Sequence, residues 1–142
     1  MNQVTEKILK GEICPYCKCE TELVRGDEIY VQDINTTPRP AYLDKFFYRC
    51  KNDKKHYVGT YLDNKTSLGS LANDELREIR SQAHKIFDPL WSKKTHFKNR
   101  DAAAKWLSHE MNIPLNLIHF GMFNEGQCRE AIQLCKNLIE NK

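Results

Sequence analysis

The spacing of apolar residues changes near residue 66. Before it, apolar residues come in short runs separated by turn-forming Gly, Pro, Asn and Asp, a pattern typical of short β-strands. After it, apolar residues recur every three or four positions, as they do along one face of an α-helix. We therefore predict an α+β fold in which zinc-ribbon-like β-hairpins (1–66) precede a three-helix segment (67–142), packed as one compact unit in one continuous domain.

Two pairs of strands are predicted in the first region. The segments TELVRG and EIYVQD read as a hairpin that turns at Gly26 and Asp27. The segments KFFYRC and HYVGTYL form the second pair. Between the pairs lies TTPRPAY, a loop whose two prolines prevent regular strand pairing.

Three helices are predicted in the second region. The first has Asn73 as its N-cap, and Pro89 ends or kinks it. Its apolar face carries Leu76, Ile79, Ala83, Ile86 and Leu90. The second helix begins after Asn99, and the third begins at Asn124, where Gln127 completes a capping-box pattern. The buried face of the third helix is Cys128, Ala131, Leu134, Cys135 and Leu138.

The composition describes a globular chain outside a membrane. Hydrophobic residues are 40% and charged residues 29% of 142 residues, so the chain can build a core. It has no apolar run of about 18 residues, the length that a membrane span requires. The first twelve residues lack the apolar segment of a signal peptide. We expect a cytoplasmic protein, in which clustered cysteines bind metal more often than they form disulfides.

A cysteine cluster is the clearest chemical signal. The stretch CPYCKC holds three of the six cysteines. The Cys14 and Cys17 thiolates can face one metal ion because a tight turn, suited by Pro15, joins them. The competing interpretation is a thioredoxin-like redox pair, but that pair accompanies a βαβ unit, which this pattern does not predict.

The remaining ligands are expected in RCKNDKKHY. Cys50 and His56 complete a C-x2-C-x32-C-x5-H pattern, and three thiolates with one imidazole suit tetrahedral Zn²⁺. Asp53 stands where a standard second knuckle has its last cysteine. Asp53 and Cys19 therefore remain alternative fourth ligands. Cys128 and Cys135 are interpreted as small core residues, with a second metal site that includes His119 as the alternative.

Two basic clusters give candidate binding residues. The net charge is only +3, but KFFYRCKNDKK and WSKKTHFKNRDAAAK each hold five basic residues and one acid. Both also carry aromatics, so they suit phosphates and bases unless they are merely solvated faces. The candidates are Phe47, Lys54, Lys55, Lys93, Lys94, Lys98 and Arg100.

Two histidines and two arginines are ambiguous. His84 can meet Asp88 one helical turn away, either to lock the helix end or to form a polar binding face. His119 is either a histidine at the core edge or a binding residue. Arg77 and Arg80 are most simply solvated helix charges.

With these residues placed, the chain resembles a family of small zinc-finger-containing domains of unknown function that occur in bacteriophages and prophages. The matching stretches are CPYC, ELVRGDEIY, FFYRC, YVGTY, SLGSLANDELREIRSQAHKIFDPLW, RDAAAKWLSHEMNIP and HFGMFNEGQC, which cover most of 14–135 in the family's order. The resemblance implies a metal-stabilised fold, a mobile-element origin and hence the cytoplasm of a host cell. The family's ligand pattern is C-x2-C…C-x2-C, from which this chain departs at its last ligand.

The sequence favours a binding protein over an enzyme. It has no H-E-x-x-H, G-x-S-x-G or P-loop, and zinc with four protein ligands has no open position for a substrate. The basic clusters favour nucleic acid as the partner. The alternative is an inhibitor or adaptor that binds a host protein, for example a defence protein.

Overall fold

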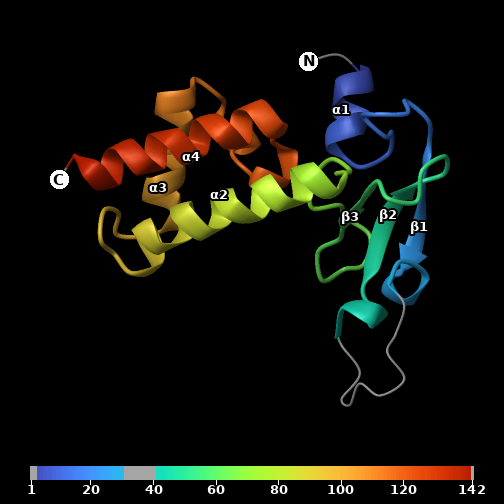
Figure 1. Ribbon diagram of the computed structural model, residues 1–142. Coiled ribbons are helices and arrows are strands. Elements are labelled where there is room, and N and C mark those ends of the chain that lie inside the picture. The colour runs from blue at the N-terminus through green and yellow to red at the C-terminus, as the bar shows by residue number, and fades with distance from the viewer. Residues whose placement is uncertain (1–2, 31–40, 142) are drawn as a thin grey trace. The chain divides into compact units, whose positions relative to one another are not determined.

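The computed structural model describes residues 3–30 and 41–141 and divides the chain into two compact units, 1–74 and 75–142 (Figure 1). Strands occur in unit 1 and the long helices in unit 2, so the predicted α+β class is confirmed. Whether the two units form one continuous domain stays a prediction. Among the described residues, no helix combines the length and apolar character needed to cross a membrane.

Unit 1 is built on a three-stranded antiparallel sheet in the order β1-β2-β3. Its elements are helix α1 (Gln3–Leu9) and strands β1 (Thr21–Arg25), β2 (Phe46–Cys50) and β3 (Tyr57–Gly59). Thr21 pairs with Cys50, and Tyr48 pairs with Val58. This register places the start of β1 and the end of β2 beside the cysteine cluster, and the second predicted strand pair is confirmed as β2 and β3.

The first predicted hairpin is wrong. β1 pairs with β2, and the described part of the predicted partner, residues 28–30, forms no strand, because Gly26–Glu28 forms a 3₁₀ turn instead of a two-residue loop. The Glu28 carboxylate accepts from the Arg25 amide at 2.9 Å, and the Gly26 amide donates to the Lys45 carbonyl at 2.7 Å. Residues 31–33 of the predicted partner strand lie outside the described residues.

The core of unit 1 is small and rich in cysteine. Its buried centre is Cys14, Cys50, Val58 and Leu71, against which Cys17, Cys19 and Tyr48 pack. Phe47 lies elsewhere in the interior and is 9% exposed. Its ring centroid is 5.9 Å from those of Tyr30 and Tyr57, and both pairs pack edge to face. Two of the four central residues are therefore candidate metal ligands.

Unit 2 contains the three predicted helices, α2 (Asp74–Ser92), α3 (Arg100–Met111) and α4 (Glu125–Glu140). The capping box predicted at Asn124 is confirmed, and Asn99, after which the second helix was predicted to begin, is the N-cap of α3. Asn99 accepts from the Ala102 amide at 2.9 Å, while Asn124 and Gln127 exchange hydrogen bonds of 2.8 and 2.9 Å. Such caps satisfy amides that have no partner inside the helix.

Two expectations about α2 are corrected. Of the two outcomes predicted at Pro89, an end or a kink, the end is wrong, because the helix continues to Ser92 and the Pro89 carbonyl accepts from the Lys93 amide at 3.1 Å. Arg80 is not solvated but 8% exposed. Its Nε and Nη2 donate to the Phe123 carbonyl at 3.1 and 2.9 Å, which gives the buried charge a polar partner.

Candidate metal centre

The first half of the centre is a tight turn from Cys14 to Cys19. The Lys18 amide donates to the Cys14 carbonyl, and the Cys14 amide donates to the Cys19 carbonyl, both at 2.9 Å. Lys18 adopts a left-handed φ of 60°, which reverses the chain directly after the second cysteine. The Cys17 amide also points at the Cys14 sulfur, 3.5 Å away. These contacts hold the first two thiols side by side.

The second half is a similar turn that follows β2. The amides of Asn52 and Asp53 each lie 3.3 Å from the Cys50 sulfur. The His56 amide donates to the Asp53 carbonyl at 3.1 Å, and the Cys50 amide donates to the His56 carbonyl at 2.9 Å. The chain therefore forms the turn of a zinc knuckle without its second cysteine, and His56 follows the turn as the next candidate ligand.

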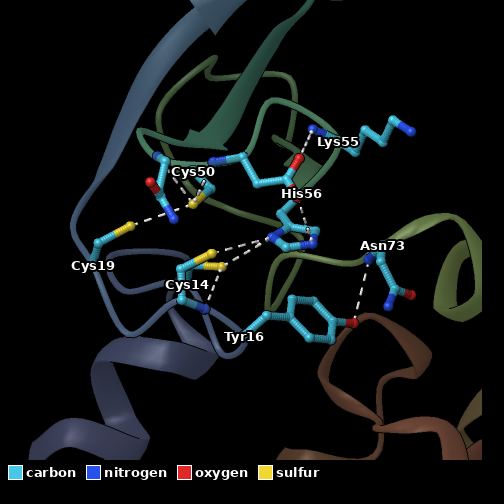
Figure 2. Close-up of polar contacts among 10 residues, drawn as sticks. Cys14, Tyr16, Cys19, Cys50, Lys55, His56 and Asn73 are labelled. Carbon is cyan, nitrogen blue, oxygen red and sulfur yellow. Dashed lines mark hydrogen bonds and ion pairs between the residues drawn. The ribbon is translucent and has the colours of Figure 1, made fainter.

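The two turns bring four candidate ligands together. Ligand atoms of Cys14, Cys17, Cys50 and His56 all lie within 4.8 Å of one another. The His56 Nδ1 faces the Cys14 sulfur at 3.5 Å (Figure 2) and lies 3.7 Å from the Cys17 sulfur. With Zn–S about 2.3 Å and Zn–N about 2.0–2.1 Å, a tetrahedral site separates a sulfur from a nitrogen by about 3.6 Å. The chemistry and spacing of these donors therefore fit zinc.

Burial shapes the chemistry of the thiols. It raises the pKa of the Cys14 thiol to about 12, while the backbone amides of Cys17 and Tyr16 act in the opposite direction. The amides favour the thiolate because they donate hydrogen bonds to it. A cation that binds this sulfur must displace its proton, so metal binding at such a site releases protons.

The two alternative ligands lie beside this group of four. The Cys19 sulfur is 3.3 Å from the Cys50 sulfur, and the Asp53 carboxylate is 3.6 Å from the His56 Nε2, the ring nitrogen that does not face the sulfurs. Each therefore contacts one candidate ligand from outside. The choice of Cys14, Cys17, Cys50 and His56 as the ligands stays a prediction.

Tyr16 is a residue of this site that the sequence did not single out. Its ring packs on the His56 ring with centroids 4.5 Å apart, and its hydroxyl accepts from the Asn73 amide at 3.2 Å (Figure 2). The position of Tyr16 between Cys14 and Cys17 could have identified it from the sequence, since a residue between two ligands must lie near the metal.

The other two cysteines are core residues. Cys128 and Cys135 are both 0% exposed. Burial raises the pKa of the Cys128 thiol to about 11 and that of Cys135 to about 12, so both are neutral at pH 7. Neither belongs to a group of metal-ligating side chains among the described residues.

The candidate binding residues of unit 1 divide into two kinds. Lys54 and Lys55 are exposed in the turn between Cys50 and His56, so their side chains can reach a partner. Phe47, also expected on a binding surface, instead lies in the interior. Its packing against Tyr30 and Tyr57 leaves little of its ring for stacking on a base.

The candidates of unit 2 gather on the connection between α2 and α3. Lys93, Lys94, Lys98 and Arg100 are all exposed. None has an ion-pair partner within the part of the chain that the structure describes. Asp101, the next residue in the sequence, lies 3.3 Å from Lys105. This segment, the 93–100 basic connection, therefore carries four positive charges that form no ion pair among the described residues.

Two histidines border the same part of unit 2. His84 Nδ1 lies 3.3 Å from the Asp88 carboxylate, which is the contact within the helix that the sequence offered as one of its two interpretations. The His84 ring packs edge to face on Phe120, with the ring centroids 4.7 Å apart. Burial first, and then the charge of Arg100, lower the pKa of His119. His84, Asp88 and Arg100 also line one small cavity of about 10 Å³, too narrow for more than a water.

Comparison with known families identifies one match. A family model described as a zinc-finger-containing domain matches residues 10–138, nearly the whole chain and both halves of the cysteine centre. No curated protein matches the chain, and no solved structure matches it.

Proposed function

The chain belongs to the zinc-finger-containing domain family, and from this premise we propose that it is a zinc-stabilised binding protein whose partner is nucleic acid. In this proposal Cys14, Cys17, Cys50 and His56 hold one Zn²⁺. The ion would join the turn before β1 to the turn after β2 and stabilise unit 1. Four protein ligands leave no position for a substrate, so binding rather than catalysis is the activity proposed.

The observation that carries the choice of nucleic acid is the 93–100 basic connection. It holds four exposed cations in eight residues with no ion-pair partner among the described residues. Cations already paired with carboxylates gain little from a phosphate, whereas unpaired ones can displace its condensed counterions. Lys54 and Lys55 in the second knuckle would add contacts from unit 1.

The salt dependence of oligonucleotide binding tests this proposal. Lys93→Glu with Lys94→Glu should weaken binding and flatten the slope of log affinity against log salt by about 2, because two phosphate contacts are lost. Lys65→Glu with Lys136→Glu is the matched control, since it makes the same charge change at exposed sites outside the cluster. Both double variants should have the same melting temperature as the wild type, because exposed lysines contribute little to folding stability.

Two outcomes would contradict the proposal. One is a wild-type protein that binds neither single- nor double-stranded oligonucleotide at about 50 mM salt, where electrostatic attraction is strong. The other is an equal loss of binding in both double variants, which would reflect net charge rather than a defined surface.

A second candidate function is a protein-binding inhibitor or adaptor, which exposed apolar residues of unit 1 favour. Tyr61 is 49% and Leu62 is 96% exposed, and such neighbouring apolar side chains suit a protein partner. The phage or prophage origin that the sequence resemblance implies would make a host protein the target. A partner recovered from nuclease-treated lysate by the wild type, but not by Tyr61→Ser with Leu62→Ser, would support this candidate.

A further inference from the structure

Asp53 occupies the position of the missing knuckle cysteine, and its carboxylate faces in two directions. Its Oδ1 accepts from the Lys55 amide at 2.9 Å. Its Oδ2 lies 3.6 Å from the His56 Nε2. Because the Lys55 amide holds one oxygen, the other is directed toward the imidazole. The side chain itself remains 44% exposed, so it can carry a negative charge at little desolvation cost.

His56 presents its two ring nitrogens to different partners. Nδ1 lies 3.5 and 3.7 Å from the sulfurs of Cys14 and Cys17, while Nε2 faces Asp53. A neutral imidazole carries one N–H, and a metal requires the bare nitrogen. A carboxylate beside Nε2 favours the proton there and leaves the Nδ1 lone pair directed at the sulfurs.

The ring has little freedom to turn. The His56 side chain is 12% exposed, and the Tyr16 ring lies 4.5 Å from it. Since the Tyr16 hydroxyl is bonded to the Asn73 amide, that ring is itself held in place. His56 is thus oriented by Asp53 beside its Nε2 and by Tyr16, whose ring packs on the imidazole (Figure 2).

We infer that Asp53 is a positioning residue, which binds no metal itself but holds His56 so that it ligates through Nδ1. The inference rests on the proposed zinc site. It explains how a knuckle without its second cysteine completes four ligands: the Asp53 amide still donates to the Cys50 sulfur, while its side chain orients the substitute ligand. Carboxylate–histidine pairs of this kind fix the tautomer at metal sites.

Zinc affinity in a set of variants tests the inference. The full chain is prepared as wild type, Asp53→Ala, Asp53→Asn, His56→Ala and the double variant with both alanines, and zinc is titrated against a chelator. Asp53→Ala should weaken zinc binding by about 10–100-fold. Asp53→Asn should remain within a few-fold of wild type, because its amide oxygen also presents an acceptor to Nε2–H. His56→Ala should cost more than either.

The double variant separates positioning from a structural role. If Asp53 acts through His56, Asp53→Ala should have almost no further effect once His56 is alanine. If it only supports the turn through the Lys55 amide, or ligates the metal directly, its full effect should persist in that background, and the inference is overturned. Long-range ¹H–¹⁵N spectra of the zinc-loaded wild type should show the His56 proton on Nε2. A proton on Nδ1 would also overturn it.

The failure of this inference is distinct from that of the zinc site. Wild-type protein that carries no zinc by elemental analysis overturns the site and the inference with it. Wild-type protein with one zinc per chain, whose affinity Asp53→Ala leaves unchanged, overturns the role of Asp53 alone.

Discussion

Removal of zinc should unfold unit 1 and leave unit 2 folded. The change is Cys14→Ser, or a chelator added to the wild type. Unit 1 has 74 residues, for which the usual stability per residue gives about 4–11 kcal/mol. Structural zinc supplies on the order of 10 kcal/mol of folding free energy. Because two of the four central core residues of this unit are themselves ligand candidates, the apolar contacts that remain cannot replace this contribution.

The distribution of aromatic residues provides the assay. All six tyrosines lie within 1–74, and both tryptophans lie within 75–142. Chelation should therefore abolish the near-ultraviolet dichroism of tyrosine while tryptophan emission stays at its native wavelength. Unit 2 retains its fold in this prediction because its buried residues, such as Leu107, Phe123 and Ala131, are supplied by its own helices and their connections.

Cys128→Ser provides the control, since it changes a thiol that belongs to no metal-ligating group among the described residues. It should keep one zinc per chain. The reasoning is refuted if a zinc-free protein retains the tyrosine signal, because the ion would then not be structural. It is also refuted if tryptophan emission shifts together with the tyrosine signal, because the two units would then unfold as one.

Three further predictions concern single residues. Arg80→Met should destabilise unit 2 by about 1.5–3 kcal/mol in tryptophan-detected denaturation, because the Phe123 carbonyl loses charged donors. The control Arg129→Met removes an exposed ion pair and should cost less than about 1 kcal/mol. Equal effects of the two substitutions would contradict the buried placement of Arg80. The lowered pKa of His119 means that its neutral form is favoured in the folded state, so this contribution to stability is lost as pH falls below the ordinary histidine range. In an NMR titration, Arg100→Gln should raise the His119 midpoint only in part, since burial is the larger cause, and an unmoved midpoint would show that Arg100 is not close. Hydrogen bonds from Thr66 lower the pKa of Asp63 to about 2. The stabilisation that the Asp63 carboxylate gives to the 63–66 turn is therefore present above about pH 4 and lost as pH falls through 2. Thr66→Val should raise the titration midpoint of Asp63 toward 3.8.

Features that depend on neighbouring residues were predictable from the sequence. The Asn99 and Asn124 caps are bonded to amides three residues away, so both partners lie in one short window. The His84–Asp88 contact spans one helical turn. The CPYC turn likewise brings its two thiols together through local hydrogen bonds. Such contacts need no knowledge of the remaining fold.

Features that depend on distant segments were not predictable in this way. The spacing of apolar residues marks β1 as a strand but does not specify its partner, and the sheet pairs it with β2 across 20 intervening residues. Arg80 has the sequence context of a solvated charge, yet a carbonyl 43 positions away accepts its hydrogen bonds. By itself the sequence determined the three helices after residue 66, the Asn124 cap and the first knuckle, because each is closed by hydrogen bonds within a few residues. The tertiary structure alone decided that His56 faces Cys14 and Cys17 while Asp53 lies at its far nitrogen, because that choice depends on where the sheet register places the second turn against the first.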